Sequence, residues 1–222
     1  MCGRYLYNID EQDLKNILES IERNNSGQSI SVSLTDSFTG GEIFPGNSVP
    51  VITAHETRFM IWGYPSLLDD RRPHINARSE TAATKRTFSA AMTARRCLIP
   101  ASSYYEWKAL SGKKKKEKYE FKLPDSEIMY MAGIYSLDDR FAILTREAML
   151  PISEIHNRMP VVIPESHMEM WLSGSVGDSN NVQQKAVTDL VFAPVNASTP
   201  VTESSPLSSH EDEQPTQLSL FP

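Results

Sequence analysis

Cys97-Leu98-Ile99-Pro100 opens a series of five short strand-like segments in the middle of this 222-residue chain. Tyr104-Tyr105-Glu106-Trp107-Lys108 follows after three small residues, and further segments of this kind span 119–123, 128–136 and 140–145. β-Branched and aromatic residues between turn residues predict strands, and short connections between strands predict antiparallel pairing. The middle of the chain therefore predicts a curled, mostly antiparallel β-sheet or barrel.

The sequence on either side of this region adds a hairpin and several helices. Residues 49–62 predict a β-hairpin, residues 79–95 predict a helix that starts at Ser79, and residues 191–195 predict a closing strand. Additional helical patterns lie at 10–23, 164–172 and 182–190. Because strands outnumber helices and turns join most of them, the sequence predicts an α+β fold with peripheral helices.

The chain is long enough for one well-cored domain, which we expect at residues 2–196. Residues 197–222 are rich in Ser, Thr, Pro and acidic residues and contain no Lys or Arg, a composition typical of a disordered tail. That tail carries four of the 28 acidic residues, so the domain is nearly neutral although the net charge is −6. A nearly neutral domain neither supports nor excludes a DNA partner.

The composition argues against several other classes of protein. Two cysteines provide no disulfide framework, and the five histidines are scattered without metal-ligand spacing, so we expect neither a metal nor another cofactor. No apolar run approaches the ~18–20 residues that span a bilayer, and the N-terminus has no signal-peptide pattern. We therefore expect a cytoplasmic monomer with no membrane partner.

The first four residues, Met1-Cys2-Gly3-Arg4, carry reactive groups. Removal of Met1 before a small side chain would leave Cys2 with an α-amine and a thiol on adjacent carbons, with pKa values of roughly 8 and about 8.5. Gly3 would let a ligand backbone approach, and Arg4 supplies a fixed positive charge suited to a phosphate. The alternative is that Cys2 is an arbitrary residue at a frayed terminus.

Three polar clusters are further candidates for chemistry. Asn76-Ala77-Arg78 places an amide and a guanidinium just before a predicted helix. Glu106 lies between aromatic residues, where burial would raise its pKa and suit it to general acid–base work; alternatively, it points outward from a half-buried strand. His156, two residues before Arg158, could shuttle protons, although a lone histidine is often structural.

These clusters occur together with other short blocks in a fixed order. The blocks are Cys2-Gly3-Arg4, Trp62-Gly63, Asn76-Ala77-Arg78-x-Glu80-Thr81, Arg95-Arg96-Cys97-Leu98-x-Pro100, Tyr105-Glu106-Trp107 and His156-x-Arg158-Met159-Pro160. In this combination, from residue 2 to about residue 196, the chain closely resembles the SOS-response-associated peptidase (SRAP) family, whose members process abasic sites in DNA.

The resemblance implies a covalent reaction at Cys2. After loss of Met1, the amine of Cys2 would form a Schiff base with the ring-opened aldehyde of an abasic site in single-stranded DNA, and the thiolate would close a thiazolidine. By similarity, Asn76 would orient the amine and the ring, Glu106 would shuttle protons, and His156 would assist opening of the sugar and reversal of the crosslink. The family is also linked to removal of its own N-terminal residue, which we assign to this site rather than to general proteolysis.

The resemblance also implies a DNA-binding surface beside the reactive cysteine. Arg4, Arg78 and Arg158 would hold phosphates, and Trp62 would stack on a neighbouring base. Gly3 would leave room for the DNA backbone. The crosslink would shield the lesion at a replication fork, which places the protein at the nucleoid.

Two other functions compete with this interpretation. An N-terminal-nucleophile glutamine amidotransferase also begins Met-Cys-Gly, but such enzymes usually continue with an apolar residue instead of Arg4 and have an Asn-Gly-Glu block, which this sequence lacks. A non-catalytic single-stranded DNA or fork-binding module would need no chemistry at Cys2. Segments 42–46 and 64–67 depart from the usual SRAP pattern and leave open the preference between single strands and junctions.

The last residues contain a second recognisable motif. Gln217-Leu218-Ser219-Leu220-Phe221 resembles the pentapeptide that binds the bacterial sliding clamp. Leu220 and Phe221 would enter an apolar pocket, Gln217 would fix the register with Leu218 beside it, and the tail would act as a flexible tether. The alternative is a chance apolar C-terminus that folds back on the domain.

Deletion of residues 217–222 tests the clamp-binding peptide. We expect the shortened protein to lose co-elution with the purified bacterial clamp while its reaction with abasic DNA stays unchanged, because the peptide is tethered away from Cys2. Clamp binding that survives the deletion would exclude the tail as the docking segment.

Overall fold

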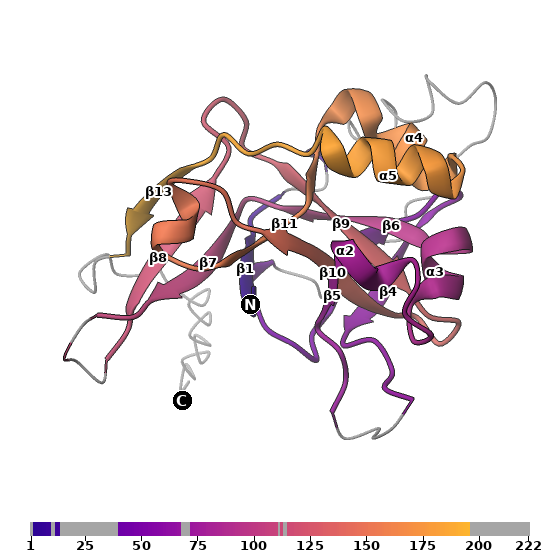
Figure 1. Ribbon diagram of the computed structural model, residues 1–222, viewed down its shortest axis with the longest axis horizontal. Helices are drawn as coiled ribbons and strands as arrows, with labels where there is room; N and C mark the ends of the chain where they lie inside the picture. Colours follow the sequence, from indigo (N-terminus) through magenta and orange to yellow (C-terminus); the bar gives the residue numbers. More distant parts are fainter. Residues whose placement is uncertain are drawn as a thin grey trace, which may run out of the picture.

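Two β-sheets organise the part of the chain that the structure describes (Figure 1). The structure is a computed structural model, and it describes residues 2–9, 12–13, 40–67, 72–110, 112 and 115–195. Most of the helix predicted at 10–23 lies outside these residues. The tail at 197–222, with its predicted clamp-binding peptide, lies outside them as well.

Short strands make up most of the secondary structure in this part of the chain. The strands are β1 (Arg4–Tyr7), β2 (Gly41–Ile43), β3 (Ser48–Ile52), β4 (Thr57–Trp62), β5 (Asn76–Arg78), β6 (Arg96–Ala101), β7 (Ser103–Lys108), β8 (Glu117–Lys122), β9 (Met129–Tyr135), β10 (Arg140–Glu147), β11 (Arg158–Pro160), β12 (Val162–Ile163) and β13 (Val191–Pro194). The α-helices are α2 (Ser79–Ala82), α3 (Ser89–Ala94), α4 (Met168–Ser173) and α5 (Val176–Gln184), and the short 3₁₀ turns are η1 (Ile152–Glu154) and η2 (Glu165–His167).

The larger sheet curls into a ring. Its strands follow the order β11-β10-β4-β3-β6-β9-β12, and an additional pairing between β9 and β10 closes the circle. Most pairs are antiparallel, but β10 runs parallel to β4 and to β5. The predicted α+β class and curled, mostly antiparallel sheet are therefore confirmed, with the two parallel pairs as an addition.

The smaller sheet brings the N-terminal residues beside the middle of the chain. Its strand order is β13-β8-β7-β1-β2, and the short β1 lies between β7 and β2. In the antiparallel pairing of β1 with β7, Arg4 stands opposite Tyr105. The residues that precede Arg4 therefore run beside those that follow Tyr105, which include Glu106.

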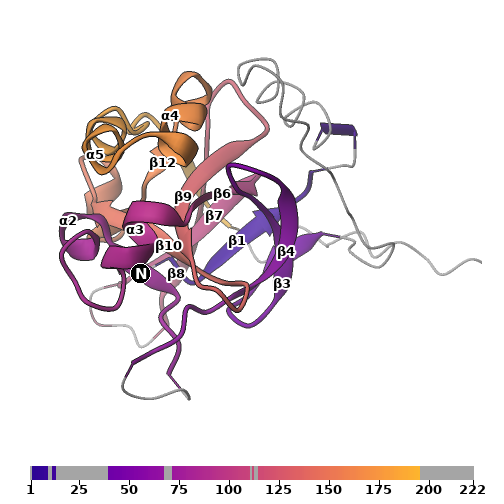
Figure 2. The same ribbon diagram turned by 90° about the vertical axis from the view of Figure 1, so that its right-hand side faces the viewer.

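The helices gather along one side of the ring, opposite the β3–β4 hairpin (Figure 2). The single helix predicted for residues 79–95 is wrong, because α2 and α3 are separate and Ser79 does not cap either one. At about 100° per residue, Ala82 and Ala91 would face opposite sides of one continuous helix. Both alanines are buried, and the break between the helices allows it.

Helix α5 begins earlier than the segment 182–190 predicts. Ser175 and Asp178 form a reciprocal capping box at its start, and Lys185 ends it. This pair of polar residues fixes the N-terminus of the helix without any apolar periodicity. The predicted closing strand is confirmed, since β13 pairs with β8.

Arg96 ties two helix ends to the ring. Its buried guanidinium donates to Met92 O at 2.7 Å and to Thr93 O, both at the end of α3. It also donates to Trp171 O and Gly174 O at the end of α4. A cation at two helix C-termini satisfies carbonyls that have no intrahelical partner and complements both helix dipoles.

We expect Arg96→Met to lower the free energy of unfolding by about 2–4 kcal/mol, because it leaves several buried carbonyls without donors. Urea denaturation followed by circular dichroism measures this change. The exposed Arg86→Met is the matched control and should change stability by no more than about 0.5 kcal/mol. Equal effects of the two substitutions would contradict the role of Arg96.

Candidate functional site

Cys2, two residues before the start of β1, is held by two hydrogen bonds that involve backbone carbonyls. The residue is fully buried. The Asn76 side-chain Nδ2 donates to Cys2 O at 2.9 Å, and the Cys2 thiol contacts Arg4 O at 3.8 Å. The N-terminal cysteine is therefore held in one place, which the alternative of a frayed terminus does not explain.

Asn76 reaches Cys2 from a short strand of the larger sheet. It lies in β5 opposite Ile143 of β10 in a parallel pairing. The amide oxygen Oδ1 is buried and has no hydrogen-bond partner. A buried amide acceptor of this kind is costly unless a donor arrives, so Oδ1 is available to accept a hydrogen bond from a group that enters beside Cys2.

Glu106 and His156 form a pair next to the cysteine. The Glu106 side chain is only 4% exposed, and its Oε1 lies 3.5 Å from His156 Nδ1. Burial raises the pKa of the Glu106 carboxyl, while the neighbouring His156 opposes this rise. His156 is 22% exposed and is held by the Arg158 backbone N–H, which donates to Nδ1 at 3.1 Å. The pair connects a buried carboxyl to the surface and can carry protons between them.

The thiol of Cys2 lies in an environment that keeps it protonated. Burial raises its pKa above the usual range, and the Glu106 carboxylate raises it further. The hydroxyls of Tyr5 and Tyr104 are also buried in this cluster and have no hydrogen-bond partners. Because the thiolate is the nucleophile, Cys2 needs a base at the moment of reaction.

Arg4 extends into an aromatic and charged surface that the sequence patterns did not single out. Its guanidinium, 40% exposed, lies over the rings of Phe44 at 4.6 Å and Trp107 at 5.2 Å. It is 3.3 Å from Glu42 Oε1, which Lys118 also contacts at 2.9 Å. The sequence could have pointed to Trp107, because it directly follows Glu106. Phe44 could not be found in this way, because it reaches Arg4 only through the long-range pairing of β1 with β2.

Arg78 and Arg158 have different surroundings. Arg78 is exposed at the end of β5. Arg158 is 13% exposed and donates to both carboxylate oxygens of Glu80, at 2.7 and 2.9 Å, and to Thr145 O. The bond from Arg158 lowers the pKa of Glu80 to about 2, so this ion pair breaks only as the pH falls toward that value. Most N–H donors of the Arg158 guanidinium are therefore already used, and fewer remain for a phosphate than on the exposed Arg78.

Trp62 is not a surface residue. Its indole is fully buried, donates from Nε1 to Ile75 O at 2.8 Å, and lies near Tyr5 and Phe141. The prediction that Trp62 stacks on a DNA base is therefore wrong, because a base could reach this ring only by opening the core. The residue instead supports β1 and the loop that leads to Asn76.

Two further features do not occur among the described residues, a metal-binding cluster and a membrane-spanning helix. Within that part of the chain, no three His, Cys, Asp or Glu side chains converge to hold a metal ion. Across the same residues, no helix has the length and apolar character required to cross a membrane. What the site does bring together is a cysteine, an amide, a carboxyl and an imidazole.

Sequence comparisons found one matching family model and several similar proteins. The sequence model described as SOS response associated peptidase (SRAP) matches residues 1–203. The abasic site processing protein YoaM of Bacillus subtilis is 33% identical over 144 residues, which is 56% of this chain and 63% of that protein. The abasic site processing protein YedK of Escherichia coli is 28% identical over 184 residues, 78% of this chain and 79% of that protein. The chain spans between 53% and 66% of the length of three similar Bacillus subtilis proteins.

Solved structures share the fold. A phage-related protein from Bordetella bronchiseptica superposes with a TM-score of 0.70 at 24% identity, over 87% of this chain and 94% of that one. Another protein from the same organism has a TM-score of 0.68 at 23% identity, over 88% of this chain and all of the other.

Removal of the Glu106 charge should change how the thiol of Cys2 titrates. In Glu106→Gln we expect the pKa of the thiol to fall, because one of its two causes of elevation is gone, although burial keeps it above the usual range. The pH dependence of iodoacetamide labelling, read from the N-terminal peptide by mass spectrometry, measures this. The exposed Glu127→Gln is the control, and an unchanged midpoint in Glu106→Gln would contradict the coupling.

Proposed function

The chain belongs to the SOS response associated peptidase (SRAP) family, and on this premise we propose that it captures abasic sites in single-stranded DNA through Cys2. The product is a thiazolidine that joins the protein covalently to the lesion. The observation that carries the proposal is the convergence of Asn76, Glu106 and His156 on one buried N-terminal cysteine. The names of the relatives, abasic site processing proteins, agree with this substrate.

The reaction needs both nucleophiles of Cys2. With Met1 attached, the Cys2 nitrogen is an amide and cannot attack an aldehyde, so Met1 must first be removed. The free amine then adds to the aldehyde carbon of the ring-opened sugar, and loss of one water gives the Schiff base. The thiol sulfur adds to the same carbon while its proton ends on the nitrogen, which closes the ring. Both groups belong to one residue, so closure is intramolecular and has a high effective molarity.

The surrounding side chains have distinct roles in these steps. Asn76 holds the Cys2 carbonyl, and its unpartnered Oδ1 is placed to accept a hydrogen bond from the free amine. Glu106, with its raised pKa, moves a proton from the amine nitrogen to the departing hydroxyl group and later moves the thiol proton to the ring nitrogen. His156 exchanges protons between Glu106 and the sugar. Arg158 positions this pair through its backbone N–H and its bond to Glu80.

The DNA strand is held by charge and by stacking. Arg4 and Arg78 bind phosphates on either side of the lesion, and Gly3 leaves space for the sugar. Trp107 and Phe44 flank Arg4 and offer rings on which neighbouring bases stack, a contact that accepts every base. A lesion without a base fits between two stacked neighbours.

A denaturing gel tests the proposal directly. Protein without Met1 is incubated with single-stranded DNA that contains one abasic site, and we expect a heat-stable adduct. Cys2→Ala should form no adduct because it has lost the thiol, whereas the matched control Cys97→Ala should react as the wild type does. No adduct from correctly processed wild-type protein would overturn the proposal. Glutaminase activity, or only a reversible gel shift, would support the competing functions.

The role of Glu106 has its own test. We expect Glu106→Gln to slow adduct formation by about 10²–10⁴-fold, the usual contribution of a general acid–base group. DNA affinity, measured by fluorescence anisotropy with an uncleavable abasic analogue, should stay within about twofold of the wild type. Equal losses of rate and affinity would show that Glu106 is structural.

A further inference from the structure

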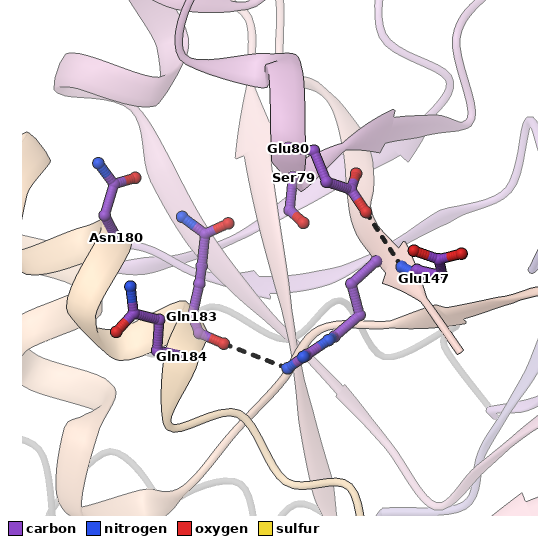
Figure 3. Close-up of a pocket in the computed structure, with 7 residues that line it drawn as sticks. Ser79, Glu80, Glu147, Asn180, Gln183 and Gln184 are labelled. Atoms are coloured by element: carbon purple, nitrogen blue, oxygen red, sulfur yellow. Dashed lines mark hydrogen bonds between the residues drawn. The ribbon is translucent and has the colours of Figure 1, made fainter. Parts of the chain in front are cut away.

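A polar cavity lies beside the proposed DNA path and has no part in the chemistry at Cys2. Its volume is about 570 Å³, and it is lined by Ser79, Glu80, Arg146, Glu147, Asn180, Gln183 and Gln184. The amides of α5 form one side, and Ser79, Glu80 and Glu147 face them (Figure 3). A second cavity of about 360 Å³ shares Glu80 and Glu147 and continues to Arg78 and Asn157. We refer to these two adjacent cavities together as the groove.

The groove starts close to the reactive cysteine. Asn76 holds Cys2, and Arg78 lies two residues further along the same strand, or about 7 Å at the usual rise per residue. Thr145 stands opposite Arg78 in β10, and Arg146 and Glu147 follow it into the larger cavity. A DNA strand whose phosphate is held by Arg78 would therefore pass along this groove.

The lining selects which part of a nucleotide can enter. Glu80 is a carboxylate fixed by Arg158, and Glu147 is exposed beside it, so a phosphate inside the cavity would meet two like charges. The cation in the same lining, Arg146, already donates to the Gln183 backbone carbonyl. The three amides of α5 and the Ser79 hydroxyl offer both donors and acceptors, which is the pattern on the edge of a nucleobase. The Gln183 side chain is already oriented, since its Nε2 donates to Ser179 O at 3.1 Å.

We propose that this groove binds one unpaired nucleobase of the DNA strand next to the abasic site, with the phosphate at Arg78 and the base among the α5 amides. This inference rests on the proposed function and deepens it by adding a base-specific contact. The Glu147 carboxylate accepts hydrogen bonds but donates none, so it favours a base with an exocyclic amine. Adenine, cytosine and guanine all carry an exocyclic amine on an edge that also has an acceptor, whereas thymine has none.

The test scans the sequence around the lesion. Oligonucleotides with one abasic site in a thymine background receive adenine, cytosine or guanine at each of the three positions on either side, and the rate of adduct formation is measured below saturation. We expect one position at which a base with an exocyclic amine raises the rate at least about fivefold over thymine. Rates that do not depend on the base at any position would overturn the proposal.

Variants locate the contact. Asn180→Ala should remove the base preference while the rate on the all-thymine substrate stays unchanged. The neighbouring Asn181→Ala is the matched control, because Asn181 is exposed on the same helix and does not line the cavity. Glu147→Gln, which adds a donor, should raise the rate with thymine at that position relative to adenine. The proposal fails if Asn180→Ala and Asn181→Ala behave alike, or if every variant slows all substrates equally.

A second readout separates this proposal from the reaction itself. Oligonucleotides that carry tetrahydrofuran in place of the abasic sugar have no aldehyde and cannot form the adduct. Their equilibrium affinity, measured by anisotropy, should show the same base preference and the same loss in Asn180→Ala. Absence of any adduct together with a preserved base preference would overturn the proposed chemistry and support base binding in the groove. Adduct formation without any base preference would support the chemistry and overturn base binding in the groove.

Discussion

Strand β10 is the constraint on which the arrangement of the site depends. It hydrogen-bonds to β4, β5, β9 and β11 among the described residues. Its pairing with β9 closes the ring, its parallel pairing with β5 places Asn76 opposite Ile143, and its pairing with β11 places Arg158 opposite Glu147. The larger sheet therefore fixes Asn76 and the start of β11 beside His156, while Glu106 comes from β7 of the smaller sheet. Placement on paired strands gives the rigidity that a preorganised site needs.

The site stores unfavourable groups that the fold has to hold in place. Glu106 is buried, and the pKa of its carboxyl is raised in the folded state. Ionisation of this carboxyl as the pH rises to neutral therefore lowers the free energy of unfolding. The Oδ1 of Asn76 and the hydroxyls of Tyr5 and Tyr104 add buried polar atoms without partners. Contacts such as those of Arg96, outside the site, offset these costs. Buried groups of this kind in one place are typical of functional sites rather than of cores.

The sequence predicted the class of fold because β6 to β10 are long enough to show their character. Strands β1 and β5 have only four and three residues, too few for a periodic pattern, and their partners lie far away in the sequence. Composition around Glu106 could not decide whether it faces inward, since that depends on the pairing of β7 with β1. Trp62 shows the opposite error: a residue in a motif was assigned to DNA, whereas its side chain packs in the core.

The contact of Glu42 with both Arg4 and Lys118 affects how DNA would be recognised. In the free protein a carboxylate already neutralises part of the charge on these two cations. A phosphate that reaches Arg4 would replace an internal anion as well as release ions from the DNA, so the net gain in electrostatic free energy is smaller than the count of cations indicates. Undamaged strands, which offer phosphates alone, would then dissociate readily, and retention would depend on the covalent bond that only a lesion can form.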